Sequence, residues 1–130
     1  DNGKVLYVAR DYVYDSGASH EAFRAAVAAN CAREQGRFWE MRDLLFKNSK
    51  HFSPATLTTH AKSLGLDLTQ FRLCLDDGYR QEVKDDYQDG KAAGMKGGAL
   101  MYYVNGYMIA TTDYDRVKEA VDNILSGKWS

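Results

Sequence analysis

Apolar positions recur every three to four residues through most of the chain, which is the spacing of helices with one buried face. We predict helices that begin near Ser19, Phe38, Pro54, Leu68, Tyr79 and Tyr114. Ser53-Pro54 places an N-cap residue before a proline at the first helical position. Asp67 and Thr112 each open a capping-box pattern, and Gly36 and Gly65 are expected to end the helices before them. The residues expected to line the last helix are Val117, Val121, Ile124 and Leu125.

Two regions have the pattern of strands instead. Lys4–Asp11 places Val5 and Tyr7 on one side and Leu6 and Val8 on the other, which predicts a strand covered on both faces. Leu100–Val104 and 107–109 flank Asn105-Gly106, a dipeptide that favours the type I′ turn of a hairpin. The predicted order is strand, five helices, β-hairpin and helix, so the fold class is α/β with a mixed sheet.

Composition places the chain among ordinary soluble domains. It has 130 residues, 45% of them hydrophobic, and a net charge of −1. No cluster of basic residues with interleaved aromatics suggests binding to nucleic acid, and no apolar run is long enough for a transmembrane segment. Residues 1–15 show no signal peptide. We expect one domain over residues 1–130.

Most kinds of reactive site are disfavoured by the spacing of the residues that they require. His20, His51 and His60 lack the spacing of metal ligands, and the glycines match no nucleotide-binding motif. No G-x-S-x-G motif is present for a serine hydrolase. We therefore predict no metal site and no cofactor, and we assign no catalytic residue.

The two cysteines leave two alternatives open. Cys31 and Cys74 are far apart and form no C-x-x-C motif. Both fall on inward faces of predicted helices, where a thiol is usually inert, and this disfavours a catalytic cysteine–histidine pair. They form either a structural disulfide, which requires an oxidising compartment, or two buried free thiols.

The stretch from Cys31 to Phe46, C-A-R-E-Q-G-R-F-W-E-M-R-D-L-L-F, resembles a helix pair of DsbA-like thioredoxin-fold proteins. These proteins are thiol–disulfide oxidoreductases of the cell envelope. Further segments resemble the same family in the same order, so that the resemblance covers nearly the whole chain. They are residues 3–11, 53–61, 64–67, 71–76 and 104–106.

This resemblance implies a thioredoxin-like (DsbA-type) mixed sheet with a helical insertion over about residues 18–78. Residues 79–130 would then hold a helix, the hairpin and the C-terminal helix. The first strand and the active-site helix of the family are absent from this chain. Because that strand lies in the middle of the sheet, we expect a protein partner, a cleaved N-terminal piece or a second copy to supply it. The alternative is a smaller sheet of three strands, in which Lys4–Asp11 pairs directly with the hairpin.

Two departures from the family pattern bear on function. The catalytic C-x-x-C is missing, and so is the proline of the family's cis-proline loop, whose equivalent here is Gly97, Gly98, Ala99 and Leu100. Pro54 is the only proline in the chain. A cis bond without proline costs about 2.5–4 kcal/mol, so we expect this loop to be trans and shaped differently.

These departures favour a domain that keeps the fold and has a degenerate redox site. Its expected role is protein binding or structure, in an extracytoplasmic place: periplasmic, secreted or tethered to the membrane. The alternative is the C-terminal part of an active thiol–disulfide oxidoreductase whose C-x-x-C lies on a missing N-terminal segment. A glutathione-transferase-like protein is a third class, although nothing here resembles its activating serine.

Overall fold

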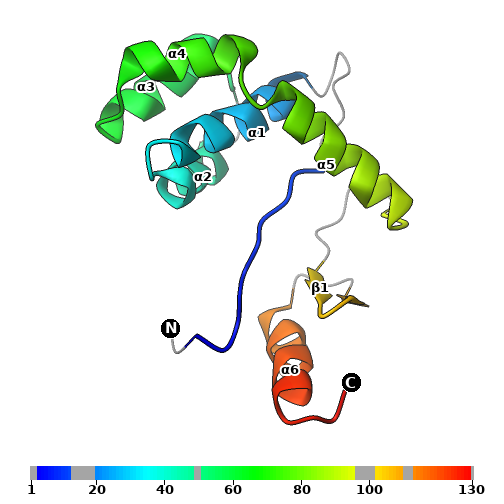
Figure 1. Ribbon diagram of the computed structural model, residues 1–130. Coiled ribbons are helices and arrows are strands. Elements are labelled where there is room, and N and C mark those ends of the chain that lie inside the picture. Colours follow the sequence, from blue (N-terminus) through cyan, green and yellow to red (C-terminus); the bar gives the residue numbers. More distant parts are fainter. Residues whose placement is uncertain (1–2, 13–19, 49–50, 96–101, 110–112, 130) are drawn as a thin grey trace. The chain divides into compact units, whose positions relative to one another are not determined.

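The computed structural model describes residues 3–12, 20–48, 51–95, 102–109 and 113–129 (Figure 1). By its internal contacts the chain divides into two compact units, Asp1–Gly90 and Lys91–Ser130. Each unit is described by itself. The expectation of one domain over residues 1–130 stays a prediction.

The first unit is a helical bundle built around α1 (His20–Arg33). α1 contacts α2 (Phe38–Lys47), α3 (Pro54–Ser63) and α4 (Leu68–Asp77), and α5 (Arg80–Ala92) runs from this unit into the next (Figure 1). The core is mostly apolar, with Asn30 as a buried polar residue, and draws on all of these helices. Its largest fully buried side chains are Phe23, Phe71, Met41, Leu57, Val27, Val83 and Cys31.

Local signals set the boundaries of α1, α3 and α4 as the sequence predicts. The Ser53 side chain accepts a hydrogen bond from the Thr56 backbone N–H at 3.2 Å, which caps α3 before its first-turn proline. Asp67 caps α4 in the same way, accepting from the Gln70 N–H at 3.0 Å. Gly36, just beyond α1, has φ of +73°, a left-handed conformation that glycine adopts without steric cost.

The predicted strand Lys4–Asp11 is not a strand in the structure. The segment carries no strand assignment, and the described residues contain only a two-stranded sheet (Figure 1). The expected cover on both faces is missing too: Val5, Leu6, Tyr7 and Val8 are 58%, 88%, 52% and 63% exposed. A strand requires a hydrogen-bonded neighbour, and among the described residues none pairs with this segment.

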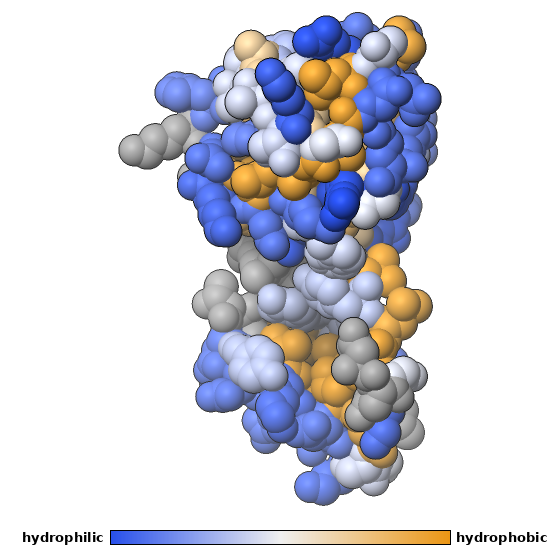
Figure 2. Space-filling model, turned by 90° about the vertical axis from the view of Figure 1, so that its left-hand side faces the viewer, coloured by the Kyte–Doolittle hydropathy of each residue, from blue (hydrophilic) through white to orange (hydrophobic). Residues whose placement is uncertain are grey.

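Orange apolar side chains also reach the surface in the upper part of Figure 2, where the helices of this unit lie.

The second unit contains the predicted hairpin. β1 (Tyr102–Val104) pairs antiparallel with β2 (Tyr107–Ile109), with Tyr103 opposite Met108. Asn105 and Gly106 have φ of +47° and +87°, the signs that a type I′ turn requires. The sheet of the described residues is therefore antiparallel, not the mixed sheet of the prediction.

α6 (Tyr114–Leu125) differs from its prediction in its N-cap residue and in the exposure of its last residue. Its N-cap is Asp113, whose carboxylate accepts from the Asp115 N–H at 2.9 Å, whereas the sequence pointed to Thr112, which lies outside the described residues. Ala120 is the buried residue of the helix, and Leu125, predicted to face inward, is 52% exposed. None of the helices that the structure describes combines the length and hydropathy needed to cross a bilayer.

Candidate functional site

Cys31 and Cys74 form a disulfide between α1 and α4. Of the two alternatives that the sequence left open, the structure contains the bonded one, with Cα atoms 5.8 Å apart. Cys31 is only 1% exposed and Cys74 is partly buried. A disulfide in such surroundings is poorly accessible to an attacking thiolate. The arrangement favours a structural cross-link over a redox centre.

Gly78, which directly follows α4, is fitted closely against this disulfide. Its backbone N–H donates to the Cys74 carbonyl oxygen at 2.6 Å. A Cβ atom at position 78 would lie 2.7 Å from both the Cys74 carbonyl oxygen and its Sγ atom. Only glycine therefore allows the chain to turn here without displacing the bridged residue.

A cluster of charged and polar groups holds the N-terminal segment against α1 and α5. Arg10 donates from Nε to Asp86 at 3.0 Å and from Nη2 to Asp89 at 2.8 Å. The Asp11 backbone N–H donates to the second Asp86 oxygen at 3.2 Å. The Asn30 amide, buried on α1, donates to the Asp11 carboxylate at 3.0 Å.

Burial raises the pKa of the Asp11 carboxyl above its ordinary value, because it disfavours the charged form. The hydrogen bond from Asn30 acts in the opposite direction, and the nearby charges of Asp86 and Glu82 add to the raising. A perturbed carboxyl is a frequent mark of a functional site, although structural clusters produce it as well. Sequence analysis did not single out Asp11, because its environment comes from helices that follow it in the chain.

Exposed aromatic side chains and an arginine form a stacked surface on the helical unit. The ring of Tyr7 stacks on that of Trp39 with centroids 5.4 Å apart. The Arg42 guanidinium lies 5.6 Å from the Trp39 ring and 4.8 Å from the Phe46 ring. Trp39 and Phe46 are 44% and 68% exposed. Tryptophan, tyrosine and arginine are the residues most enriched among energetically dominant contacts of protein interfaces.

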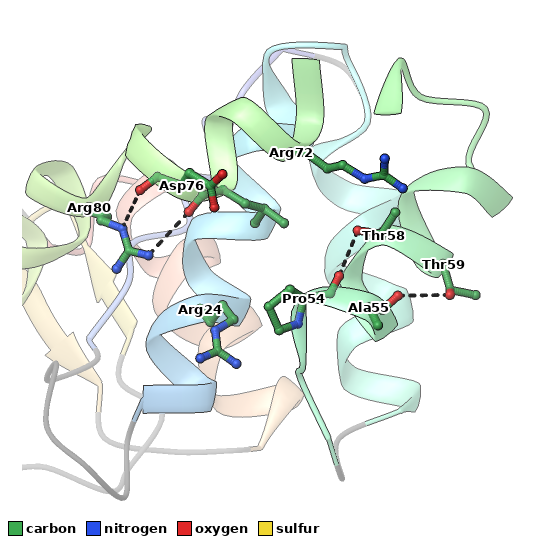
Figure 3. Close-up of a pocket in the computed structure, with 9 residues that line it drawn as sticks. Arg24, Pro54, Ala55, Thr58, Thr59, Arg72, Asp76 and Arg80 are labelled. Atoms are coloured by element: carbon green, nitrogen blue, oxygen red, sulfur yellow. Dashed lines mark hydrogen bonds between the residues drawn. The ribbon is translucent and has the colours of Figure 1, made fainter. Parts of the chain in front are cut away.

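A cavity of about 590 Å³ lies on the helical unit (Figure 3). Three arginines line it: Arg24 from α1, Arg72 from α4 and Arg80 at the start of α5. The remaining lining residues are Pro54, Ala55, Thr58, Thr59, Leu75 and Asp76. Sequence reasoning missed this cavity, because no local motif indicates that residues so far apart in the sequence lie around one hollow.

The equivalent of the cis-proline loop, Gly97, Gly98, Ala99 and Leu100, lies outside the described residues. Its shape and its trans geometry stay predictions. The hairpin that follows it is described, and a second cavity, of about 450 Å³, lies beside β2. Tyr107, Met108, Ile109, Lys128 and Trp129 line this cavity.

Comparisons with known proteins connect these features to a family. The family model described as thioredoxin matches residues 1–123. A Na⁺/H⁺ antiporter NhaA 3 of Salinispora tropica is 43% identical over 84 residues, which are 63% of this chain and 13% of the relative. A Na⁺/H⁺ antiporter NhaA 1 of Mycolicibacterium gilvum is 32% identical over 109 residues, or 78% of this chain and 17% of the relative. The chain thus spans less than a fifth of the length of these curated relatives. No solved structure gives a significant match.

Proposed function

The chain belongs to the thioredoxin family, whose model matches residues 1–123, and from this premise we propose that it is a DsbA-like domain with a protein-binding or structural role. The observation that carries the proposal is the Cys31–Cys74 disulfide. These are the only two cysteines of the chain, and the disulfide joins both of them across two helices. A thiol–disulfide oxidoreductase needs an accessible, activated thiolate, and this chain has no free cysteine to provide it.

The replacement of the loop proline supports the same reading. Counted back from Asn105-Gly106, Leu100 stands where DsbA-like proteins hold the cis-proline, and counted forward from Gly97, Ala99 does. A loop that has given up this residue is less suited to holding a substrate strand beside a reactive disulfide. The proposed domain therefore keeps the fold of the family without its exchange chemistry.

The unpaired N-terminal segment supports the proposal that a further strand completes the sheet. Val5 to Val8 are four consecutive exposed apolar residues with no strand partner among the described residues, and such a segment is available for pairing with another strand. We propose that this strand comes from a protein partner, from another part of a longer polypeptide or from a second copy. Size-exclusion chromatography with light scattering tests this on the 130-residue chain: dimers or larger species are expected, and a stable compact monomer contradicts it.

The relatives suggest where such a domain works. They are named as Na⁺/H⁺ antiporters, and this chain matches only a small part of each. We propose that the chain is likewise a domain of a longer, membrane-associated polypeptide and lies on the extracytoplasmic side. The disulfide supports this location, because such bonds persist in oxidising compartments. Labelling with a membrane-impermeant reagent in intact cells tests it, and protection of the domain until lysis argues against it.

Membership of the thioredoxin family also favours a second candidate function. An active thiol–disulfide oxidoreductase can carry its C-x-x-C on a segment that precedes residue 1, with this chain as its C-terminal part. Insulin reduction separates the two functions when the complete gene product is assayed beside the 130-residue chain. We expect neither to reduce insulin. Turnover by the complete product that is lost when an upstream cysteine pair is replaced refutes the proposal.

A further inference from the structure

We propose that the cavity between α1, α3, α4 and the start of α5 is a binding site for a small phosphomonoester. The proposal depends neither on redox chemistry nor on the missing strand. Three observations carry it (Figure 3). The three arginines of the lining have no carboxylate partner among the described residues, the lining has a net positive charge, and the N-terminus of α3 lies at the cavity.

The guanidinium groups at the cavity have no carboxylate partner among the described residues. Arg24 donates to the Phe52 carbonyl oxygen at 3.2 Å, and Arg80 donates to the carbonyl oxygens of Asp76 and Leu75 at 3.1 and 3.5 Å. Arg72 is exposed and makes no hydrogen bond or ion pair within the described ranges. Bonds to neutral carbonyls position a guanidinium without cancelling its charge.

Arginines elsewhere in the same unit behave differently. Arg10 pairs with two aspartates, Arg33 pairs with Glu82, and Arg37 pairs with Glu40. Apart from Arg42 on its aromatic surface, the cavity therefore gathers the three arginines of this unit that have no carboxylate partner among the described residues. Guanidinium groups bind phosphate through paired N–H donors, so such a gathering suits an oxyanion.

The charge count favours a dianion. Three guanidiniums and one carboxylate, that of Asp76, line the cavity, which leaves two positive charges. A phosphomonoester carries between one and a half and two negative charges at neutral pH. Asp76 also disfavours larger polyanions, because it would repel phosphates placed along the same wall.

The N-terminus of α3 adds to the positive electrostatic potential of the cavity. Pro54 and Ala55 form its first turn at the cavity, and the positive end of the helix dipole lies there. The hydroxyls of Thr58 and Thr59 donate to the carbonyls of Pro54 and Ala55, one turn earlier in α3, at 2.8 and 3.0 Å, so the arginines and the helix end are the donors left for the ligand. In Figure 3 Ala55, Thr58 and Thr59 lie at one side of the view and Arg80 at the other, with Arg24 between them beside Pro54. Leu75 supplies an apolar surface for the organic part of the ligand.

The test is titration of the full 130-residue chain with inorganic phosphate and with phenyl phosphate, followed by amide NMR shifts. Saturable shifts are expected at Ala55, Thr58, Arg72 and Asp76, and sodium chloride at equal ionic strength should not reproduce them. Phenyl phosphate should bind at least as tightly as phosphate. Shifts spread over the surface, or equal responses to chloride, overturn the proposal.

Two variants with the same change in charge make the test specific. Arg72→Gln removes a guanidinium that has no described partner, so the fold should be kept, and affinity should fall by about tenfold, the loss expected for one charge-assisted hydrogen bond. Arg116→Gln removes an exposed arginine from α6, in the other unit, and should change affinity by less than about twofold. Equal losses in both variants mean that net charge alone governs binding, which refutes a site. Binding to phosphatidylglycerol vesicles without binding to either phosphate probe also refutes it, in favour of a membrane surface.

Discussion

Removing the Cys31–Cys74 disulfide should strongly destabilise the helical unit. The bridge joins residues separated by 43 positions, and constraining a loop of that length lowers the entropy of the unfolded chain. The chain-entropy estimate converts this to about 4 kcal/mol of free energy of unfolding at room temperature. This is a large share of the 5–15 kcal/mol that stabilises a typical domain. We therefore expect Cys31→Ala/Cys74→Ala to be folded only marginally.

Urea denaturation followed by far-ultraviolet circular dichroism measures this loss. With a slope of about 2 kcal/mol per molar, a change of 4 kcal/mol lowers the urea midpoint by about 2 M. The oxidised protein, the reduced protein and the double variant are compared in the same buffer. The reduced protein and the double variant should agree, because both lack the cross-link and keep a small side chain at each position.

Two results would refute the reasoning. If the unfolded, unreduced protein takes up a thiol-alkylating reagent at both cysteines, the bond is absent and the estimate has no basis. If the bond is present but its removal leaves the midpoint unchanged, the unfolded chain must be nearly as compact without it. Intact mass before and after reduction distinguishes the two cases.

Three further outcomes follow from the structure. Gly78→Ala should lower the free energy of unfolding by about 1–3 kcal/mol in a urea titration, because its Cβ would meet the Cys74 carbonyl oxygen at 2.7 Å; an unchanged midpoint contradicts the geometry. Ser53→Ala should cost about 1 kcal/mol in the same assay, since it removes the cap of α3, and Ser53→Thr should restore most of this loss. Asp11→Asn should become more stable than the parent as pH rises through the raised pKa of the carboxyl. The parent loses stability over this range, because its unfolded state releases the Asp11 proton more readily than its folded state, whereas asparagine does not titrate. Its stability difference from the parent should be small under acid conditions, and a difference that does not change with pH argues against burial as the cause.

The helices were predictable because their signals are local. Ser53 and Asp67 each cap a helix by accepting a hydrogen bond from the backbone N–H three residues later, and Asn105-Gly106 turns the hairpin through its own conformational freedom. Each of these features depends on a few neighbouring residues. The sequence therefore contains all the information that they require.

Features that depend on distant partners were not predictable to the same degree. Lys4–Asp11 has the composition of a strand, but a strand forms only when another segment pairs with it, and composition does not provide that neighbour. The bonding of Cys31 with Cys74 stayed open until the packing of α1 on α4 placed their Cα atoms 5.8 Å apart. The arginine-lined cavity is the extreme case, because residues from four helices must assemble before it exists.

The disulfide also determines how the domain would respond to mechanical force. Tension applied at the two chain ends passes through the Cys31–Cys74 bond and bypasses the residues between them. α2, α3 and most of α4 lie within that closed loop and would bear no load. Full extension of the oxidised chain should fall short of that of the reduced chain by about 150 Å, at roughly 3.5 Å for each of the 43 bypassed positions. The bridge would therefore shield the residues between the two cysteines from stretching when the ends of the domain are pulled.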